Sequence, residues 1–333
     1  MNEDAESNAI PEEHEEFTLQ PMTVGQTLDR IWVILRRNAL LLLALGAAPA
    51  LSVLLSYGAV LAWLFAEHIL PPQQNENSRK LVSEWLVAAP LGSVPFFLIY
   101  ALFMAATCWA ALAADRGESP TLRDAYRAAW RRAGRYCWLM ILQCLCIAVP
   151  VIVCGAAVAG GFVLAASAQT GRPGPAALFF LMPLVLLVYP LIFAYAVWMG
   201  LRISLAFPAS VAEDLTAMEA LKRSGRLTHR AKGRMFLVLL VVYAVGYAVM
   251  MVLELVGMAV VAVAALAAEG MHLGLAQPLT LVGMGVLGLG MAAVLLLCMA
   301  GTWASYAVTF SVIYGDQRLR WELARKTAVE TNP

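Results

Sequence analysis

Few residues of this sequence could carry chemistry, and Glu254 is the most isolated of them. It is the one charged residue in the apolar run of residues 235–268. An ionisable residue inside a membrane helix usually marks a functional site and needs a partner. Glu254 lies 20 residues after Arg234, which is about 30 Å of helix rise. If the membrane begins at Met235, Glu254 lies at the opposite surface of the membrane. If the helix is centred within residues 235–268, Glu254 lies near the middle of the membrane.

Arg202 is the second candidate, because it ends an apolar run and precedes Pro208 by six residues. Proline lacks an amide donor and disfavours helical geometry at the residue before it, so we expect the chain to turn near Phe207. Arg202 could anchor the helix at the membrane surface. Alternatively, its forked guanidinium could pair with Glu213 or Asp214, or bind carbonyls freed by the turn.

The sequence shows none of the common catalytic patterns. It lacks a phosphate-binding glycine loop, a Gly-x-Ser-x-Gly motif and a histidine-rich metal set, and His68 and His272 stand far apart. We therefore predict no enzyme activity, no cofactor and no metal site.

These residues sit in a chain that is 61% hydrophobic and only 14% charged, against about 25% charged for an average soluble domain. About 20 apolar residues cross a bilayer as a helix. The long apolar runs of this sequence therefore predict an all-α, polytopic membrane protein. The last uncharged run, between Glu269 and Asp316, is long enough for two membrane helices. Its polar residues His272 and Gln277 lie near its start, which favours one long helix. The six predicted transmembrane helices are 39–66, 86–114, 137–168, 176–206, 235–268 and 278–314.

The distribution of Lys and Arg predicts the topology. Of the 23 basic residues, 20 fall in the N-terminal segment, two alternate loops and the tail, and 3 fall in the other loops. Basic loops stay in the cytoplasm, so we expect a multi-pass protein of a bacterial inner membrane with both termini cytoplasmic. The expected partner is the lipid bilayer, through its anionic headgroups, and a protein partner stays open; a net charge of +1 gives no indication of nucleic acid.

Three similar segments precede the odd-numbered predicted helices. Each begins with a threonine and has a polar partner three residues later, as in a capping box; the pairs are Thr23 with Gln26, Thr121 with Asp124 and Thr216 with Glu219. Apolar residues follow at helical spacing, and basic residues end each segment. We expect amphipathic helices at 23–36, 121–134 and 216–229 along the cytoplasmic membrane surface; solvated connectors are the alternative.

This pattern divides the chain into three parts. Residues 1–20 form an acidic arm that we expect to be disordered, because residues 1–16 hold seven acids and no Lys or Arg. Residues 21–314 form the membrane domain, as three parallel repeats of about 21–114, 119–206 and 214–314. Residues 315–333 form a cytoplasmic tail. Each repeat is one surface helix followed by one membrane hairpin.

Two stretches carry a family resemblance. Thr23-Val-Gly-Gln-Thr-Leu-Asp-Arg is followed by Arg36-Arg37-Asn38, and residues 202–213 (RISLAFPASVAE) are followed by residues 220–224 (ALKRS), which include Ser224. Together they resemble the bacterial glycerophosphoryl diester phosphodiesterase membrane-domain family and related uncharacterised six-helix inner-membrane proteins. The resemblance implies the membrane module only, because the chain has no room for the catalytic barrel.

These observations favour a non-catalytic membrane module that assists a partner or organises lipid. The alternative is a transporter of a small or lipidic solute, which the repeats and the intramembrane prolines would suit. Thr302, Ser305, Tyr306 and Thr309 share one helix face. A water-accessible cavity on that face would favour transport.

Overall fold

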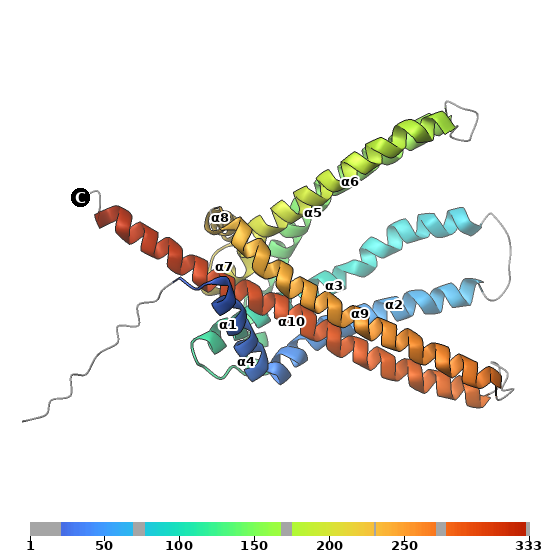
Figure 1. The fold of residues 1–333 in the computed structure, drawn as a ribbon, viewed down its shortest axis with the longest axis horizontal. Helices are drawn as coiled ribbons and strands as arrows, with labels where there is room; N and C mark the ends of the chain where they lie inside the picture. The colour runs from blue at the N-terminus through green and yellow to red at the C-terminus, as the bar shows by residue number, and fades with distance from the viewer. Residues whose placement is uncertain (1–20, 69–76, 168–174, 230, 271–277, 331–333) are drawn as a thin grey trace, which may run out of the picture.

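The computed structural model describes residues 21–68, 77–167, 175–229, 231–270 and 278–330 (Figure 1). Every regular element in these ranges is an α-helix. The helices are α1 (Val24–Arg37), α2 (Ala39–His68), α3 (Asn77–Asp115), α4 (Leu122–Trp130), α5 (Ala133–Ser167), α6 (Pro175–Ile203), α7 (Ala206–Ala212), α8 (Ala217–Thr228), α9 (Lys232–Gly270) and α10 (Pro278–Glu330).

Six of these helices, α2, α3, α5, α6, α9 and α10, are long and apolar enough to cross a membrane. The six predicted apolar helices are therefore confirmed. The largest differences from the predicted bounds are that α3 begins at Asn77 and that α10 continues through the predicted tail to Glu330; the surface helix predicted at 121–134 ends earlier, at Trp130. The helix α10 can continue past residue 314 because Asp316 and Gln317 are buried there among hydrogen-bonding partners.

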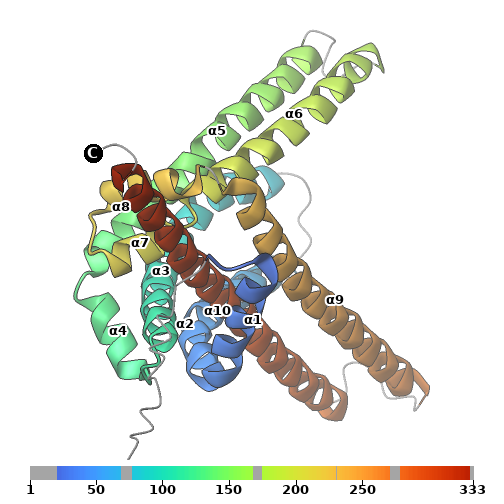
Figure 2. The same ribbon diagram turned by 60° about the vertical axis from the view of Figure 1, so that its left-hand side comes forward.

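The long helices contact one another as α2 with α3, α5 with α6, and α9 with α10. Figure 1 shows the three pairs diverging from one end of the molecule, where α1, α4, α7 and α8 gather, and in Figure 2 the α5–α6 and α9–α10 pairs again point in different directions. The helix α10 contacts α1, α2, α3, α7, α8 and α9, so it links most of the other elements. We call the gathered end the short-helix end.

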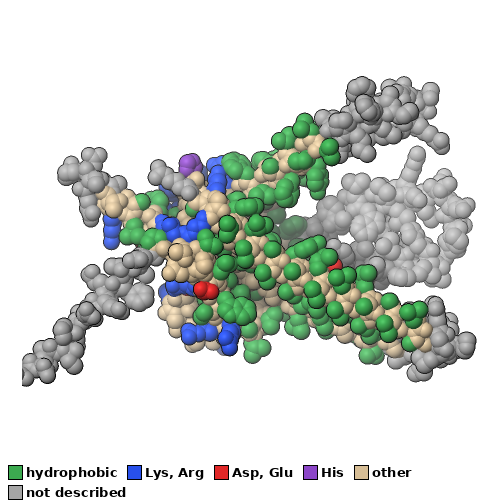
Figure 3. Space-filling view, in the orientation of Figure 1, with side chains coloured by type: hydrophobic (Ala, Val, Ile, Leu, Met, Phe, Trp, Pro, Cys, Tyr) green, Lys and Arg blue, Asp and Glu red, His purple; other side chains and the backbone are tan. Residues whose placement is uncertain are grey.

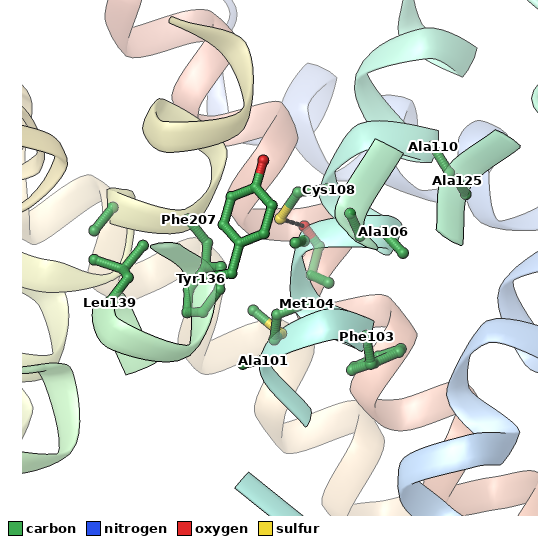
Figure 4. Packing of buried hydrophobic residues seen from close by; sticks show 14 of the residues in the cluster. Ala101, Phe103, Met104, Ala106, Cys108, Ala110, Ala125, Tyr136, Leu139 and Phe207 are labelled. Atoms are coloured by element: carbon green, nitrogen blue, oxygen red, sulfur yellow. Dashed lines mark hydrogen bonds between the residues drawn. The ribbon is translucent and has the colours of Figure 1, made fainter. Parts of the chain in front are cut away.

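Small residues on α3 let its neighbours pack closely. Ala101, Ala106 and Ala110 are almost completely buried, and Tyr136 of α5 and Phe207 of α7 belong to the same cluster (Figure 4). Small side chains at helix contacts allow close approach of the helices. The core therefore lies near the short-helix end.

The backbones of α2 and α10 approach each other closely at Gly46. A methyl group added at Gly46 would lie 2.5 Å from the carbonyl oxygen of Ala300. Any larger residue at this position would have to push the two helices apart. Gly46 thus sets the distance between the first and last long helices.

The predicted helix starts are confirmed for all three short helices. Thr23 and Gln26 form a reciprocal capping box at α1, and Thr216 and Glu219 do so at α8. At α4, the hydroxyl of Thr121 accepts a hydrogen bond of 3.2 Å from the amide of Asp124. These side chains satisfy the first free amides of each helix.

The apolar stripe of α1 packs mostly on protein. Ile31 and Ile34 are buried in the core, and Val24, Leu28 and Leu35 pack against the same cluster. We expected the stripe to face the acyl boundary, but α9, α10, α2 and α3 contact this helix. In the predicted stripe, Trp32 is the exposed member, with 63% of its surface accessible.

Candidate functional site

The turn between α6 and α7 is fixed by a serine from α8. The hydroxyl of Ser224 donates a hydrogen bond of 2.7 Å to the carbonyl of Arg202 and accepts one of 3.2 Å from the amide of Leu205. The amide of Gln143 donates to the carbonyl of Ile203 at 2.9 Å. Ser224 is completely buried. Backbone groups freed at the end of α6 are therefore bound by side chains from α5 and α8.

The prediction of a turn at Phe207 is wrong in its position. The chain leaves helical geometry at Ser204 and Leu205, and Phe207 is already helical. Pro208 is the third residue of α7 and is buried. The first turn of a helix does not need its amide donors, so proline is tolerated there.

Arg202 does not pair with Glu213 or Asp214, so this prediction is also wrong. Arg223 of α8 binds Glu213 with hydrogen bonds of 2.9–3.1 Å. Arg132 and Arg135 bind Asp214 instead. The guanidinium of Arg202 lies 5.5 Å from the ring of Trp198 on its own helix, and its side chain is exposed. This placement suits the surface-anchor alternative.

Glu213 connects three helices at the short-helix end. Besides Arg223, it accepts a hydrogen bond of 2.6 Å from the hydroxyl of Tyr314 on α10. Burial acts to raise the pKa of Glu213, but the hydrogen bonds from Tyr314 and Arg223 outweigh it and lower that pKa. The guanidinium of Arg223 also lies 4.4 Å from the ring of Trp321. These contacts hold α8 against α10.

A buried acid, Asp316, binds the beginning of the described chain to α9 and α10. It accepts hydrogen bonds from the amide of Met22 at 2.8 Å, from Arg234 at 3.0 Å and from Arg320 at 2.8 Å. Arg234 and Arg320 also donate to the carbonyl of Met22. The side chain of Asp316 is only 2% exposed. The sequence reasoning missed this group, although an acid directly after the last apolar run was a signal for it.

Next to these two networks, residues of α6, α8, α9 and α10 line an open cavity of about 1280 Å³. We call it the basic cavity, because its lining includes six Lys and Arg residues and no Asp or Glu. The six cations are Arg202, Lys222, Arg226, Arg234, Arg320 and Arg325. The other lining residues include His229, Gln317 and Trp321. Such a lining can bind anions, and guanidinium groups suit phosphate and carboxylate oxygens in particular.

The basic cavity borders the apolar surface of the long helices. Trp198 lies near the end of α6, is 43% exposed, and has Lys232 at 4.8 Å and Arg202 at 5.5 Å from its ring. Figure 3 shows Lys and Arg gathered at the short-helix end and hydrophobic side chains covering the long helices beyond it. A ligand in the cavity could therefore touch both polar and apolar surfaces.

The other sequence candidates lie elsewhere. Glu254 is an exposed residue of α9 with no ion-pair partner among the residues that the structure describes. On α10, the hydroxyls of Thr302, Ser305 and Thr309 donate to carbonyls of their own helix. Tyr306 stacks on Tyr243 of α9, with 4.1 Å between ring centres. This face of α10 packs against α9 and does not line the basic cavity.

The basic cavity offers anion binding, and its described lining supplies no carboxylate to act as a general base. In the described ranges, no three His, Cys, Asp or Glu side chains come together as metal ligands. Sequence reasoning singled out Arg202 as an anchor or ion-pair partner and did not bring it together with the other five cavity cations. The six cations come from four separate helices, and no spacing along the chain shows that they converge.

Residues 22–308 match the model of a protein family described as a domain of unknown function, DUF7847. The chain belongs to this family, and the match runs from the beginning of α1 into α10. No curated protein and no solved structure shows significant similarity to the chain.

Proposed function

We propose that this member of the family is a non-catalytic module of a bacterial inner membrane that organises anionic phospholipid at its cytoplasmic face. The observation that carries the proposal is the basic cavity, in which six cations line one space without an acid. Basic pockets between membrane helices on the cytoplasmic side suit lipid phosphate groups. Each Lys or Arg near an anionic surface contributes about 1 kcal/mol to binding.

The proposed topology puts the short-helix end in the cytoplasm and both termini with it. The 20-to-3 division of basic residues supports this orientation. Exposed tryptophans at the same end also support it: Trp32 on α1 is 63% exposed and Trp130 on α4 is 71% exposed. Tryptophan is enriched at membrane interfaces. In this arrangement α1 and α4 would lie near the headgroups.

We further propose that the fold consists of three repeats, each a short amphipathic helix followed by a membrane hairpin. The order of elements supports this, since α1, α4 and α8 each precede two long helices that contact each other. The caps of the three short helices are similar. The short helix α7 is an addition to the third unit.

The resemblance to the glycerophosphoryl diester phosphodiesterase membrane domain fits the same proposal. Its second stretch begins at Arg202 and ends at Ser224, and these two residues are joined by a hydrogen bond of 2.7 Å. The stretch thus makes one structural unit beside the basic cavity. A module of this kind would organise lipid and could assist a partner protein.

Transport of a small or lipidic solute is the alternative. A water-accessible cavity on the polar face of α10 was the further observation expected to favour it. Because those hydroxyls are satisfied within the helix and Tyr306 packs on Tyr243, the structure gives transport no specific support.

Lipid binding by the full chain tests the proposal. The protein would be placed in nanodiscs of phosphatidylcholine with or without phosphatidylglycerol, and the lipids retained by it would be counted by native mass spectrometry. We expect enrichment of phosphatidylglycerol, and a loss of that enrichment when Lys222 and Arg226 are both changed to Gln. The matched control changes Arg318 and Lys326 of α10 to Gln, because both are exposed and neither lines the basic cavity; the loss of charge is the same.

Two results would contradict the proposal. One is equal retention of the zwitterionic and anionic lipids by the unmodified protein. The other is an equal loss of enrichment in the cavity and control variants, which would assign the effect to total charge rather than to the basic cavity.

A further inference from the structure

The cations of the basic cavity fall into two sets on different helices. The α6–α8 set consists of Arg202, Lys222 and Arg226, and the α9–α10 set consists of Arg234, Arg320 and Arg325. The two sets approach each other because α6 contacts both α8 and α9, and α8 contacts α10. The cavity therefore has two cationic walls.

Each wall keeps positive charge that the protein does not neutralise. Within the described chain, no acid forms an ion pair with a cation of the α6–α8 set; Lys222 does interact with the nearby Glu219 through space. In the α9–α10 set, Asp316 is shared between Arg234 and Arg320, and Arg325 lies 5.7 Å from the ring of Trp321. One phosphate group with a single charge would leave most of this charge unmatched.

The size of the cavity also favours a ligand with more than one phosphate group. Its volume of about 1280 Å³ exceeds the roughly 300–1,000 Å³ of a site for one drug-sized ligand. Two phosphate groups held on opposite walls would use both the space and the charge. A phosphodiester on each wall could receive hydrogen bonds from guanidinium groups of that wall.

The apolar surroundings indicate that the ligand is a lipid. Exposed apolar residues continue from the cavity along both adjoining long helices: Leu191 and Phe193 on α6, and Leu237 and Leu240 on α9. Both ribbon views show α6 and α9 diverging from this end (Figures 1 and 2). Acyl chains could cover these faces while the headgroup stays among the cations.

We propose that the basic cavity binds a phospholipid with two phosphodiester groups, one on each wall. This inference rests on the proposed function and names the ligand class of the same site. Two linked phosphates gain affinity over two separate lipids, because the second contact forms within one molecule. A two-phosphate lipid should therefore be preferred at equal total phosphate.

The test uses the full chain in phosphatidylcholine nanodiscs containing either cardiolipin or twice as much phosphatidylglycerol. Competition for the protein is measured by native mass spectrometry. We expect cardiolipin to be preferred at equal phosphate. Arg226→Gln on one wall and Arg325→Gln on the other should each lower cardiolipin affinity about five-fold and reduce the preference. Lys326→Gln, at an exposed position of α10 outside the cavity lining, is the control and should leave the preference unchanged.

Each outcome gives a distinct answer. Equal binding of cardiolipin and phosphatidylglycerol, both above phosphatidylcholine, overturns the two-phosphate inference and leaves the proposed function standing. No preference for either anionic lipid overturns both. Displacement of cardiolipin by millimolar inorganic phosphate, but not by chloride at the same ionic strength, would assign the cavity to soluble phosphate compounds and overturn the lipid assignment.

Discussion

Replacing Ser224 by alanine should loosen α8 from the turn between α6 and α7. The substitution removes one hydroxyl that donates to the carbonyl of Arg202 at 2.7 Å and accepts from the amide of Leu205 at 3.2 Å. Each buried backbone group left unpaired costs roughly 1–3 kcal/mol. For the two groups together we therefore expect the free energy of unfolding to fall by about 2–6 kcal/mol. Unfolding would be followed by tryptophan fluorescence during a titration of mixed micelles with sodium dodecyl sulfate.

Two variants of neighbouring residues serve as controls. Ser204 lies in the same turn, but its hydroxyl donates only to the carbonyl of Leu201 within the same short stretch, at 2.9 Å; Ser204→Ala should cost less than about 1 kcal/mol. Arg202→Lys keeps the carbonyl that Ser224 binds and should unfold like the parent protein. Equal losses for Ser224→Ala and Ser204→Ala would refute the reasoning. A large loss for Arg202→Lys would show that the guanidinium, and not the backbone, holds the turn.

Three further outcomes follow from the structure. Gly46→Ala should cost about 1–3 kcal/mol in detergent, whereas Gly58→Ala on the same helix, where an added methyl group meets no atom within 4 Å, should be neutral or stabilising. Glu213→Gln should lower stability at pH 7 by roughly 2–3 kcal/mol. Because the pKa of Glu213 is lowered in the folded protein, its contribution is present above about pH 4.3 and lost as pH falls through the folded pKa. A pH series should therefore be flatter for this variant between pH 5 and pH 3 (roughly the window of an ordinary glutamate). In intact cells, a membrane-impermeant thiol reagent should label a cysteine placed at Asn75 and not one at Pro120; the reverse result contradicts the topology.

The long helices could be predicted from the sequence because their signal is local. A run of apolar residues defines each of them, and a threonine with its partner three residues later defines the starts of the short helices. Their ends were harder to predict. The helix α10 continues past residue 314 because Asp316 binds Arg320 on the same helix and also Arg234 and Met22, and the last two come from distant parts of the chain.

The site could be predicted only in part for the same reason. Arg202, Glu213 and Ser224 were identified, and all three do lie around the turn after α6. The ion-pair partners of these residues were not identified, because several Lys and Arg residues were within plausible reach of each acid. Asp214 is bound by Arg132 and Arg135, about 80 residues earlier in the sequence. Ion pairs of this kind depend on how the helices cross, and the local sequence pattern does not predict that crossing.

The contact between Gly46 and Ala300 can form only late in the synthesis of the chain. Ala300 follows Gly46 by 254 residues, and synthesis proceeds at about 5–20 residues per second. After α2 is made, about 13–50 s pass before its partner surface on α10 exists. During that interval the face of α2 at Gly46 has no α10 to pack against. A chain stalled before Ala300 would keep that face open, which makes the last helix the step that commits the protein to its final form.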